Sequence, residues 1–275
     1  MREQNIKESL RRHYDRLVEY MGGERYIVGL FLVGSQNYGT DTEFSDVDTK
    51  AIVLPRLEDI IYNKPAISTT IYVRKPVDPI TDIMEQITVV DVRLLMERVK
   101  KQNINYLEIF FTNYFILNKD YADLWNELVE NRESLAHYMP YRIAAATAGA
   151  FRNKTKEITH KKLSELFRLR DFLYKYIVKK STFKEALHPN DIDFVKTVKL
   201  GEKYEEALFH IIAEPLIEEI DMLMETAKTV KVDKNAWDLT EWLSIKFPYE
   251  VMTRYLEKEL KREAELKELE ENNAY

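Results

Sequence analysis

The sequence predicts an α+β fold, with strands in the N-terminal part and an all-helical C-terminal part. Three observations predict it. Five of the seven glycines lie between Gly22 and Gly39. Most runs of β-branched residues, which favour strands, lie before about residue 120. After that point the pattern is helical, and only Gly149 and Gly201 interrupt it. We therefore expect two domains, residues 1–120 and residues 121–275.

Hydrophobic spacing predicts the elements of the N-terminal part. Residues 3–20 carry apolar side chains at helical intervals, and the glycines at 22 and 23 end this helix. The apolar run 26–33 has the length of a strand and suits one buried on both faces. Asp91 stands where the N-cap of a following helix belongs. The remaining elements expected here are strands at 47–54, 68–73 and 87–90 and a helix at 92–101.

The C-terminal part consists of helical patterns with short connections. Its last stretch alternates acidic and basic residues at helical spacing, which is typical of a solvated helix with ion pairs four residues apart. The expected helices span residues 121–130, 140–152, 159–180, 183–187, 190–196, 201–227, 234–245 and 248–270.

Composition excludes several classes of function. Of 275 residues, 45% are hydrophobic and 32% charged, which fits a globular protein. The absence of cysteine excludes disulfides, thiolate zinc sites and cysteine nucleophiles. A net charge of −6 argues against a general nucleic-acid coat, although it allows a local basic patch. No apolar run is long enough for a membrane span or a signal peptide, so we expect a cytoplasmic protein without a membrane partner.

A turn with phosphate-binding character follows the first strand. Gly34 closes the apolar run, and a glycine there lets the backbone approach a ligand closely. The next residues, 36–42, could form a short helix whose N-terminus favours phosphate oxygens. Ser35 adds a hydroxyl group that could bind the same phosphates.

Asp46 and Asp48 are two residues apart at the start of the second expected strand, so both carboxylates point to one face. Two such charges about 4 Å apart repel by roughly 1–4 kcal/mol, depending on the local dielectric. A divalent cation such as Mg²⁺ makes this arrangement favourable. With a third carboxylate, the pair would form a two-metal site for displacement at phosphorus. A lone Asp-x-Asp is common in surface turns; its combination with Gly34-Ser35 and two flanking strands favours the site.

These motifs resemble those of the polymerase-β-like nucleotidyltransferases, and more closely a predicted nucleotidyltransferase family of bacteria and phages. The resemblance spans about residues 27–170. Its first block is Gly34-Ser35-Gln36-Asn37-Tyr38-Gly39, followed by Ser45-Asp46-Val47-Asp48. The second block is Asp91-Val92-Arg93, an apolar helix, Asn103 and Leu107-Glu108. The third is Lys161-Lys162-Leu163 with Arg168-Leu169.

The resemblance implies a mixed-sheet core, a helical domain that covers the site, and nucleotidyl transfer that depends on one or two Mg²⁺ ions. By position, Asp46 and Asp48 would bind metal, and the Gly34–Ser35 segment would hold the outer phosphates. The family acid expected as third ligand matches Gln86, which is a departure. Asp91 matches a family acid and is our preferred third ligand, although it could be only a helix cap. Glu85, one residue out of register, is the second choice.

A basic segment could face this site. Residues 152–180 hold ten Lys or Arg residues against three acids. Lys161 and Arg168 are seven apart and share a helix face, so they could clamp a triphosphate, or they could belong to a solvated surface. Tyr38 could stack on a base or pack in the core. Lys50 shares the face of the carboxylates and could contact a phosphate or form a structural ion pair.

The sequence therefore predicts a Mg²⁺-dependent enzyme that moves a nucleoside monophosphate from a nucleoside triphosphate to an acceptor hydroxyl group. An RNA end, a protein side chain and a small molecule are all acceptable acceptors. The alternative is a catalytically inactive nucleotide- or RNA-binding module with the same fold. A third carboxylate facing Asp46 and Asp48 would separate the two hypotheses.

Overall fold

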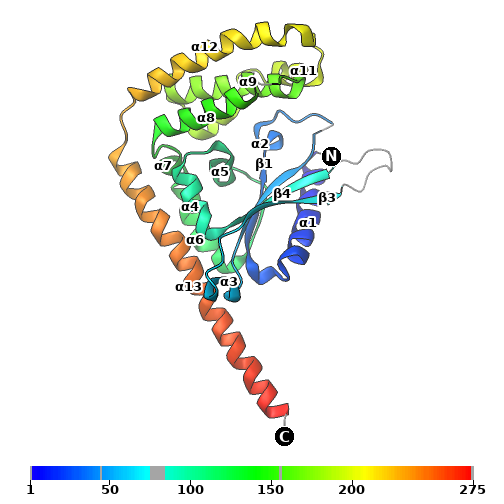
Figure 1. The fold of residues 1–275 in the computed structure, drawn as a ribbon, viewed down its shortest axis with the longest axis vertical. Helices are drawn as coiled ribbons and strands as arrows, with labels where there is room; N and C mark the ends of the chain where they lie inside the picture. Colours follow the sequence, from blue (N-terminus) through cyan, green and yellow to red (C-terminus); the bar gives the residue numbers. More distant parts are fainter. Residues whose placement is uncertain (1, 44, 75–83, 155–156, 274–275) are drawn as a thin grey trace.

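The structure, a computed structural model, describes residues 2–43, 45–74, 84–154 and 157–273. It confirms the predicted α+β class, because a five-stranded mixed sheet is followed by an all-helical C-terminal region (Figure 1). The strand order is β3-β4-β2-β1-β5. The strands are β1 (Ile27–Val33), β2 (Asp48–Val53), β3 (Ser68–Arg74), β4 (Met84–Asp91) and β5 (Phe115–Leu117).

Strand pairing brings the two chemical motifs to one end of the sheet. β1 is buried almost throughout, as its apolar sequence predicts, and pairs antiparallel with β2 and β5. In this pairing Val33 at the end of β1 lies opposite Asp48 at the start of β2. β4 runs parallel to β2, so its first residues lie at the same end and Asp91 lies at the other.

Helices cover both faces of the sheet (Figure 1). Helix α1 (Arg2–Met21) packs on one face, where its buried His13 reaches Thr49 of β2. The other face is covered from several segments, and there Trp125 stacks on Phe31 with ring centroids 4.2 Å apart. The elements on this side include α4 (Val92–Lys100), α5 (Ile104–Leu107), the 3-10 helix η2 (Glu108–Phe110), α6 (Ala122–Glu130), α7 (Arg132–Ala136) and the first part of α13 (Lys234–Asn273).

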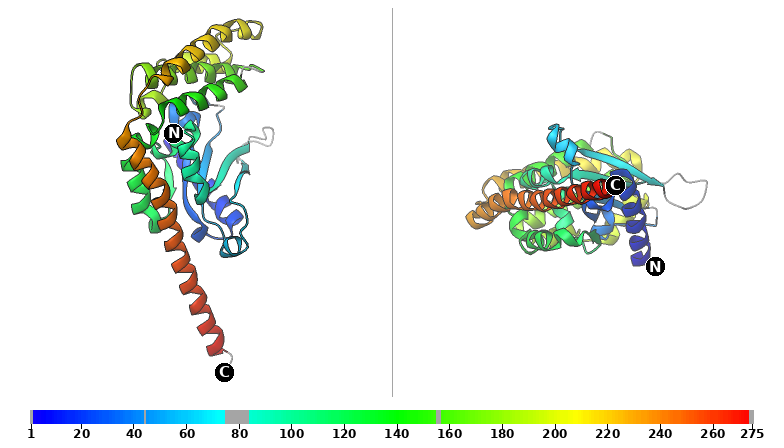
Figure 2. Two further views of the ribbon diagram at one scale, coloured as in Figure 1. Left: turned by 60° about the vertical axis from the view of Figure 1, so that its left-hand side comes forward. Right: turned by 90° about the horizontal axis from the view of Figure 1, so that it is seen from below.

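The helices between residues 140 and 228 form a bundle at the end of the sheet where β1 finishes (Figures 1 and 2). Helix α2 (Ser35–Tyr38) lies between the sheet and this bundle (Figure 1). From the bundle α13 descends along the sheet, and its residues 261–271 project away with every side chain exposed. The bundle contains α8 (Pro140–Lys154), α9 (His160–Leu173), the π-helical turn Tyr174–Val178, α10 (Phe183–Leu187), α11 (Ile192–Leu200) and α12 (Phe209–Lys228).

One hydrophobic core extends across the expected domain boundary between residues 120 and 121. Trp125 follows that boundary yet packs between Phe31, Phe110 and Phe247. Tyr255 of α13 likewise contacts Tyr26, which precedes β1. The last helix of the chain is therefore part of the support of the sheet. No helix of the described segments has the length and apolar character needed to cross a bilayer.

Several predicted boundaries are wrong. The expected helix 201–227 starts only at Phe209, because Gly201 takes a left-handed conformation (φ 81°) that ends α11. The helices expected at 234–245 and 248–270 are one continuous helix, α13, with Pro248 inside it. β4 begins three residues before the predicted strand. The polar residues Glu85 and Gln86 interrupt the apolar pattern there, so the sequence did not indicate the start of the strand. The short elements β5 and α7 were not predicted.

Candidate active site

A cavity of about 580 Å³ opens between the end of the sheet and the helical bundle. The expected residues Gly34, Ser35, Asp46 and Asp48 all line it. Residues from two distant helices, α9 and α11, complete its wall. The full lining is Gly34, Ser35, Tyr38, Thr40, Thr42, Ser45, Asp46, Asp48, Asn105, Lys161, Ser164, Glu165, Arg168, Val195, Lys199 and Leu200.

The floor of the cavity is the segment Gly34–Gly39, which we call the Gly34 turn. Gly34 has φ 80° and ψ −152°, a backbone conformation that only glycine adopts without strain. A Cβ atom at this position would lie 3.8 Å from Oδ2 of Asp48, so the turn passes directly beside that carboxylate. The single turn of α2 starts at Ser35 and ends at Gly39, which is left-handed (φ 75°).

Asp46 and Asp48 reach the cavity together, while Val47 between them is buried in the core. This alternation agrees with the prediction that both carboxylates share one face, although Asp46 precedes β2 instead of lying on it. Burial raises the pKa of Asp48, and the neighbouring charge of Asp46 raises it further. Lys161 acts in the opposite direction. The pair therefore carries like charges that the protein compensates only in part.

Gln86 occupies the position beside the pair where a third acid was expected. The parallel register aligns Thr49 with Ile87, which places Asp48 next to Gln86. The backbone N–H of Gln86 lies near enough to the Asp48 carboxylate to act to lower its pKa. Its side chain is exposed on the same face as the pair. A neutral amide therefore stands where a third carboxylate was expected beside the pair.

The preferred third ligand, Asp91, lies far from the pair, and that prediction is corrected. Asp91 is aligned with Val53 at the opposite end of β2. It comes five positions after Gln86 on β4, a distance of about 16 Å along a strand. Its carboxylate accepts hydrogen bonds from the backbone N–H of Arg93 at 2.9 Å and from the guanidinium of Arg93 at 2.6 and 3.0 Å. Asp91 is therefore the N-cap of α4.

The second choice, Glu85, points to the opposite face of the sheet and is corrected as well. It is fully buried against α1, where it accepts hydrogen bonds from Ser9, Arg12 and His13 at 3.3, 2.9 and 3.1 Å. Burial favours a higher pKa for Glu85, but the hydrogen bonds from His13 and Arg12 outweigh it and hold that pKa below its ordinary value. Successive residues of a strand face opposite sides, so a neighbour of Gln86 cannot share its face.

The donor set fits Mg²⁺ bound jointly with a nucleotide, and it does not fit a preformed metal cage. Among the described residues, no group of three or more His, Asp or Glu side chains could hold an ion. Mg²⁺ in proteins is commonly held by one or two carboxylates together with substrate phosphates and water. Asp46 and Asp48, beside the Gly34 turn, provide the first of these contributions.

Three cations from the helical bundle, Lys161, Arg168 and Lys199, line the cavity together with the acid Glu165, and we call these three cations the basic wall. Arg168 is buried, and its Nη1 has no hydrogen-bond partner within the described chain. Lys199 donates to the backbone oxygen of Thr40 at 3.2 Å and to Ser45 Oγ at 2.8 Å. Burial lowers the pKa of Lys199, and the charge of Lys161 lowers it further. The mutual repulsion of Lys161 and Lys199, with Arg168 on the same cavity, suits this surface to a polyanion.

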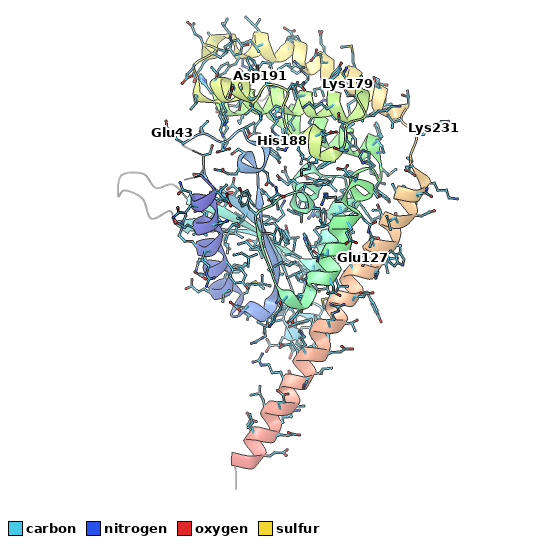
Figure 3. The ribbon with its side chains drawn as sticks, turned by 180° about the vertical axis from the view of Figure 1, so that it is seen from behind. Glu43, Glu127, Lys179, His188, Asp191 and Lys231 are labelled. Atoms are coloured by element: carbon cyan, nitrogen blue, oxygen red, sulfur yellow. The ribbon has the colours of Figure 1, made fainter. Side chains whose placement is uncertain are left out.

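Lys199 was missed at the sequence level, because nothing in α11 distinguishes it from other surface lysines. It lies more than 150 residues from the Gly34 turn in the chain and meets it only through the packing of α11 on α9. A second contact from this region is His188, whose Nδ1 lies 3.2 Å from the backbone oxygen of Tyr38. Figure 3 shows His188 between the bundle and the ribbon of α2.

Tyr38 and Lys50 are both buried and pack against neighbouring side chains around the cavity. Tyr38 is 4% exposed and its ring lies under the guanidinium of Arg168, so it packs, as one of the two expected alternatives has it. Lys50 is also buried; its Nζ donates to the backbone oxygen of Asn105 and lies 3.9 Å from the ring centroid of Tyr106. Burial lowers the pKa of Lys50 to about 8.

Comparisons with known proteins give a distant structural likeness. No protein-family profile matches the chain, and no curated protein matches it in sequence. Among solved structures, the chain is similar to a nucleotidyltransferase-like protein from Exiguobacterium sibiricum 255-15. The alignment covers 87% of this chain and 78% of that chain, with 12% sequence identity and a TM-score of 0.30.

Proposed function

We propose that the protein is a Mg²⁺-dependent nucleotidyltransferase, which moves a nucleoside monophosphate from a nucleoside triphosphate to an acceptor hydroxyl group. One observation carries the proposal: the acidic pair Asp46 and Asp48 lines a single cavity together with the basic wall and the Gly34 turn. A cavity of about 580 Å³ is in the range of small-molecule sites, which are typically about 300–1,000 Å³.

The two charged sides divide the work on the nucleotide. The basic wall binds the β- and γ-phosphates, because Arg168 offers buried N–H groups that lack a partner within the described chain. Ser35 contributes a hydroxyl group at the floor. Asp46 and Asp48 hold the cation, which would neutralise charge at the α-phosphate. Fixing the triphosphate at both ends orients its α-phosphorus toward the acceptor, and this positioning supplies much of the catalysis.

The reaction conserves its atoms and charges as follows. The acceptor oxygen forms a new bond to the α-phosphorus while the bond from that phosphorus to the α–β bridging oxygen breaks. Pyrophosphate leaves with the bonding electrons, and the acceptor proton passes to solvent. The side chains bind and orient; none forms a covalent intermediate. An RNA end, a protein hydroxyl group and a small-molecule hydroxyl group are the acceptor classes to be tested.

A label-transfer experiment tests the proposal. The protein is incubated with Mg²⁺ and each nucleoside triphosphate labelled at the α-phosphate, together with cellular RNA, protein or metabolites. We expect transfer of the α-label and not of a γ-label. The double variant D46N/D48N should lose transfer, whereas Asp91→Asn, a matched change in a carboxylate outside the cavity, should retain it. Transfer that persists in the double variant would refute the site.

Gln86 supports a second candidate function, namely a nucleotide-binding module without turnover. A neutral amide beside Asp48 removes one of the three charges that a two-metal centre uses. This alternative predicts that nucleoside triphosphate binds with Mg²⁺ but that no label is transferred to any acceptor class. Calorimetry with Mg²⁺ and a non-hydrolysable triphosphate measures the binding, and the label-transfer experiment measures turnover, so the two functions are distinguished.

A further inference from the structure

A second buried acid lies beneath the cavity and has no part in the function proposed so far. Glu108, in η2, is 2% exposed. Its carboxylate accepts a hydrogen bond from the backbone N–H of Gly34 at 3.1 Å, and the hydroxyl group of Tyr38 interacts with the same carboxylate. Both partners belong to the Gly34 turn. Glu108 therefore contacts the turn at two points, its first residue Gly34 and its second-to-last residue Tyr38.

Cations lie around this carboxylate although it is buried. Burial raises the pKa of Glu108, while the charges of Lys50 and Arg168 act to lower it. A buried carboxylate is costly unless it is hydrogen-bonded and compensated. It is also an anion placed beneath a turn that we expect to receive phosphates, which is electrostatically unfavourable for substrate binding. A buried acid that opposes phosphate binding in this way should contribute something else to the site, and its contacts indicate that contribution.

The role follows from the conformation of the turn. The peptide of Gly34 must hold a glycine-specific conformation for the chain to leave β1 and pass beside Asp48. Its N–H is directed down to Glu108 and away from the cavity. Near the other end of the same turn, the hydroxyl group of Tyr38 interacts with Glu108. The guanidinium of Arg168 lies over the Tyr38 ring, 4.2 Å from the ring centroid. One carboxylate thus links the floor of the cavity to its basic wall.

We propose that Glu108 is a positioning residue, which sets the Gly34 turn and Tyr38 so that Ser35 and Arg168 meet the same triphosphate; this inference rests on the proposed function. The mechanism is geometric. A glutamine at position 108 can accept from the Gly34 N–H through its oxygen and donate to the Tyr38 oxygen through its nitrogen. Both contacts then survive without the charge.

Nucleotide binding distinguishes the positioning role from general stability. We expect Glu108→Ala to raise the Kd for Mg²⁺ and a non-hydrolysable triphosphate by about tenfold or more, since hydrogen bonds to a charged group are lost. Glu108→Gln should restore an affinity within about twofold of the unmodified chain. The matched control is Glu85→Gln, because Glu85 is an equally buried acid on the other face of the sheet. It should lower the Tm and leave the Kd unchanged.

Two results would overturn the inference. One is a wild-type Kd in a folded Glu108→Ala variant. The other is an equal loss of affinity in Glu85→Gln, which would assign the effect to stability alone. If Glu108→Ala does not fold, Tyr38→Phe removes the hydroxyl group that interacts with Glu108, with little change of volume. That variant should weaken binding by about threefold, and an unchanged Kd would count against the proposal.

A measurement without nucleotide separates this inference from the proposed function. Amide hydrogen exchange is followed over residues 33–39 in the unliganded protein. Exchange at Gly34 should accelerate in Glu108→Ala and remain slow in Glu108→Gln and Glu85→Gln. If the unmodified protein binds no triphosphate, the proposed function fails, and the exchange result still decides whether Glu108 positions the turn. Unchanged exchange in Glu108→Ala would overturn the positioning role.

Discussion

The guanidinium of Arg168 lies over the ring of Tyr38, 4.2 Å from the ring centroid. This contact joins α9 of the helical bundle to the Gly34 turn at the end of β1. The ring covers one face of the cation and leaves its N–H groups available at the edge, where Nη1 lacks a partner within the described chain. A stacked guanidinium is rigid and planar, so it is prepared for an anion before the anion arrives.

Arg168→Lys tests whether that planar geometry matters. Lysine retains the charge but loses the stack and the forked donors. We expect the KM for nucleoside triphosphate to rise by about tenfold while the Tm changes little. The matched control is Arg170→Lys on the same helix, because Arg170 pairs with Glu219 at 3.0 Å outside the cavity. An equal effect in both variants would contradict the assignment. Steady-state kinetics and thermal unfolding supply the measurements.

Lys161→Ala tests the second member of the basic wall against its neighbour in sequence. Lys161 lines the cavity, whereas the Nζ of Lys162 donates to the backbone oxygen of Glu157 at 2.7 Å. We expect Lys161→Ala to weaken triphosphate binding by about threefold to tenfold, and to reduce its dependence on salt. Lys162→Ala should bind as the unmodified chain does. Titration with triphosphate at two ionic strengths measures both effects. A larger loss of affinity in Lys162→Ala than in Lys161→Ala would contradict the assignment of Lys161 to the basic wall.

Asp48→Asn should stabilise the metal-free protein at neutral pH while removing its response to Mg²⁺. Burial and Asp46 raise the folded-state pKa of Asp48, so the folded state holds this proton more tightly than the unfolded chain. The resulting destabilisation grows as pH rises from the unfolded pKa to the folded pKa and is complete above it. The asparagine variant lacks this penalty. Tm measured from pH 3 to 8, with and without Mg²⁺, tests both parts; a lower Tm at pH 7 would contradict the first.

Gln86→Asp should supply the third carboxylate that the sheet lacks. Gln86 lies beside Asp48 on the same face, so an acid there adds a ligand and a charge next to the pair. We expect the Mg²⁺ concentration that gives half of the maximal Tm response to fall by about tenfold. The metal-free protein should become less stable, because three carboxylates repel more than two. Gln86→Asn, which shortens the side chain without adding charge, should leave the metal response unchanged.

Asp91→Ala should affect folding and not the site. Its carboxylate caps α4 and pairs with Arg93, so its removal should lower the free energy of unfolding by about 1 kcal/mol. Asparagine caps helices nearly as well, and Asp91→Asn should lose less. Triphosphate affinity should be unchanged in both variants. A normal unfolding free energy together with a lost Mg²⁺ response would return Asp91 to the metal site. Chemical denaturation and calorimetry decide between these outcomes.

Local patterning was sufficient for most of the secondary structure and for one side of the cavity. The apolar run before Gly34 has the length of a strand buried on both faces, and the two-residue spacing of Asp46 and Asp48 on a strand gives them a shared face. The elements that local pattern did not predict are those that depend on contacts. β5 is three residues long and pairs with β1, and the start of β4 carries polar residues that its neighbours accommodate.

By itself, the sequence determined that a glycine turn follows a buried strand and that two carboxylates share one face, because spacing along a strand dictates which side chains share a face. Pairing of β1 with β2 then brought the turn and the carboxylates together. Only the tertiary structure decided which residue stands beside them. Strand register placed Gln86 beside the carboxylates, sent Glu85 to the face of α1 and left Asp91 at the far end of β4. The packing of α9 and α11 decided the basic wall, bringing Lys199 to a turn more than 150 residues away. Register and helix packing depend on long-range contacts, which no local pattern encodes.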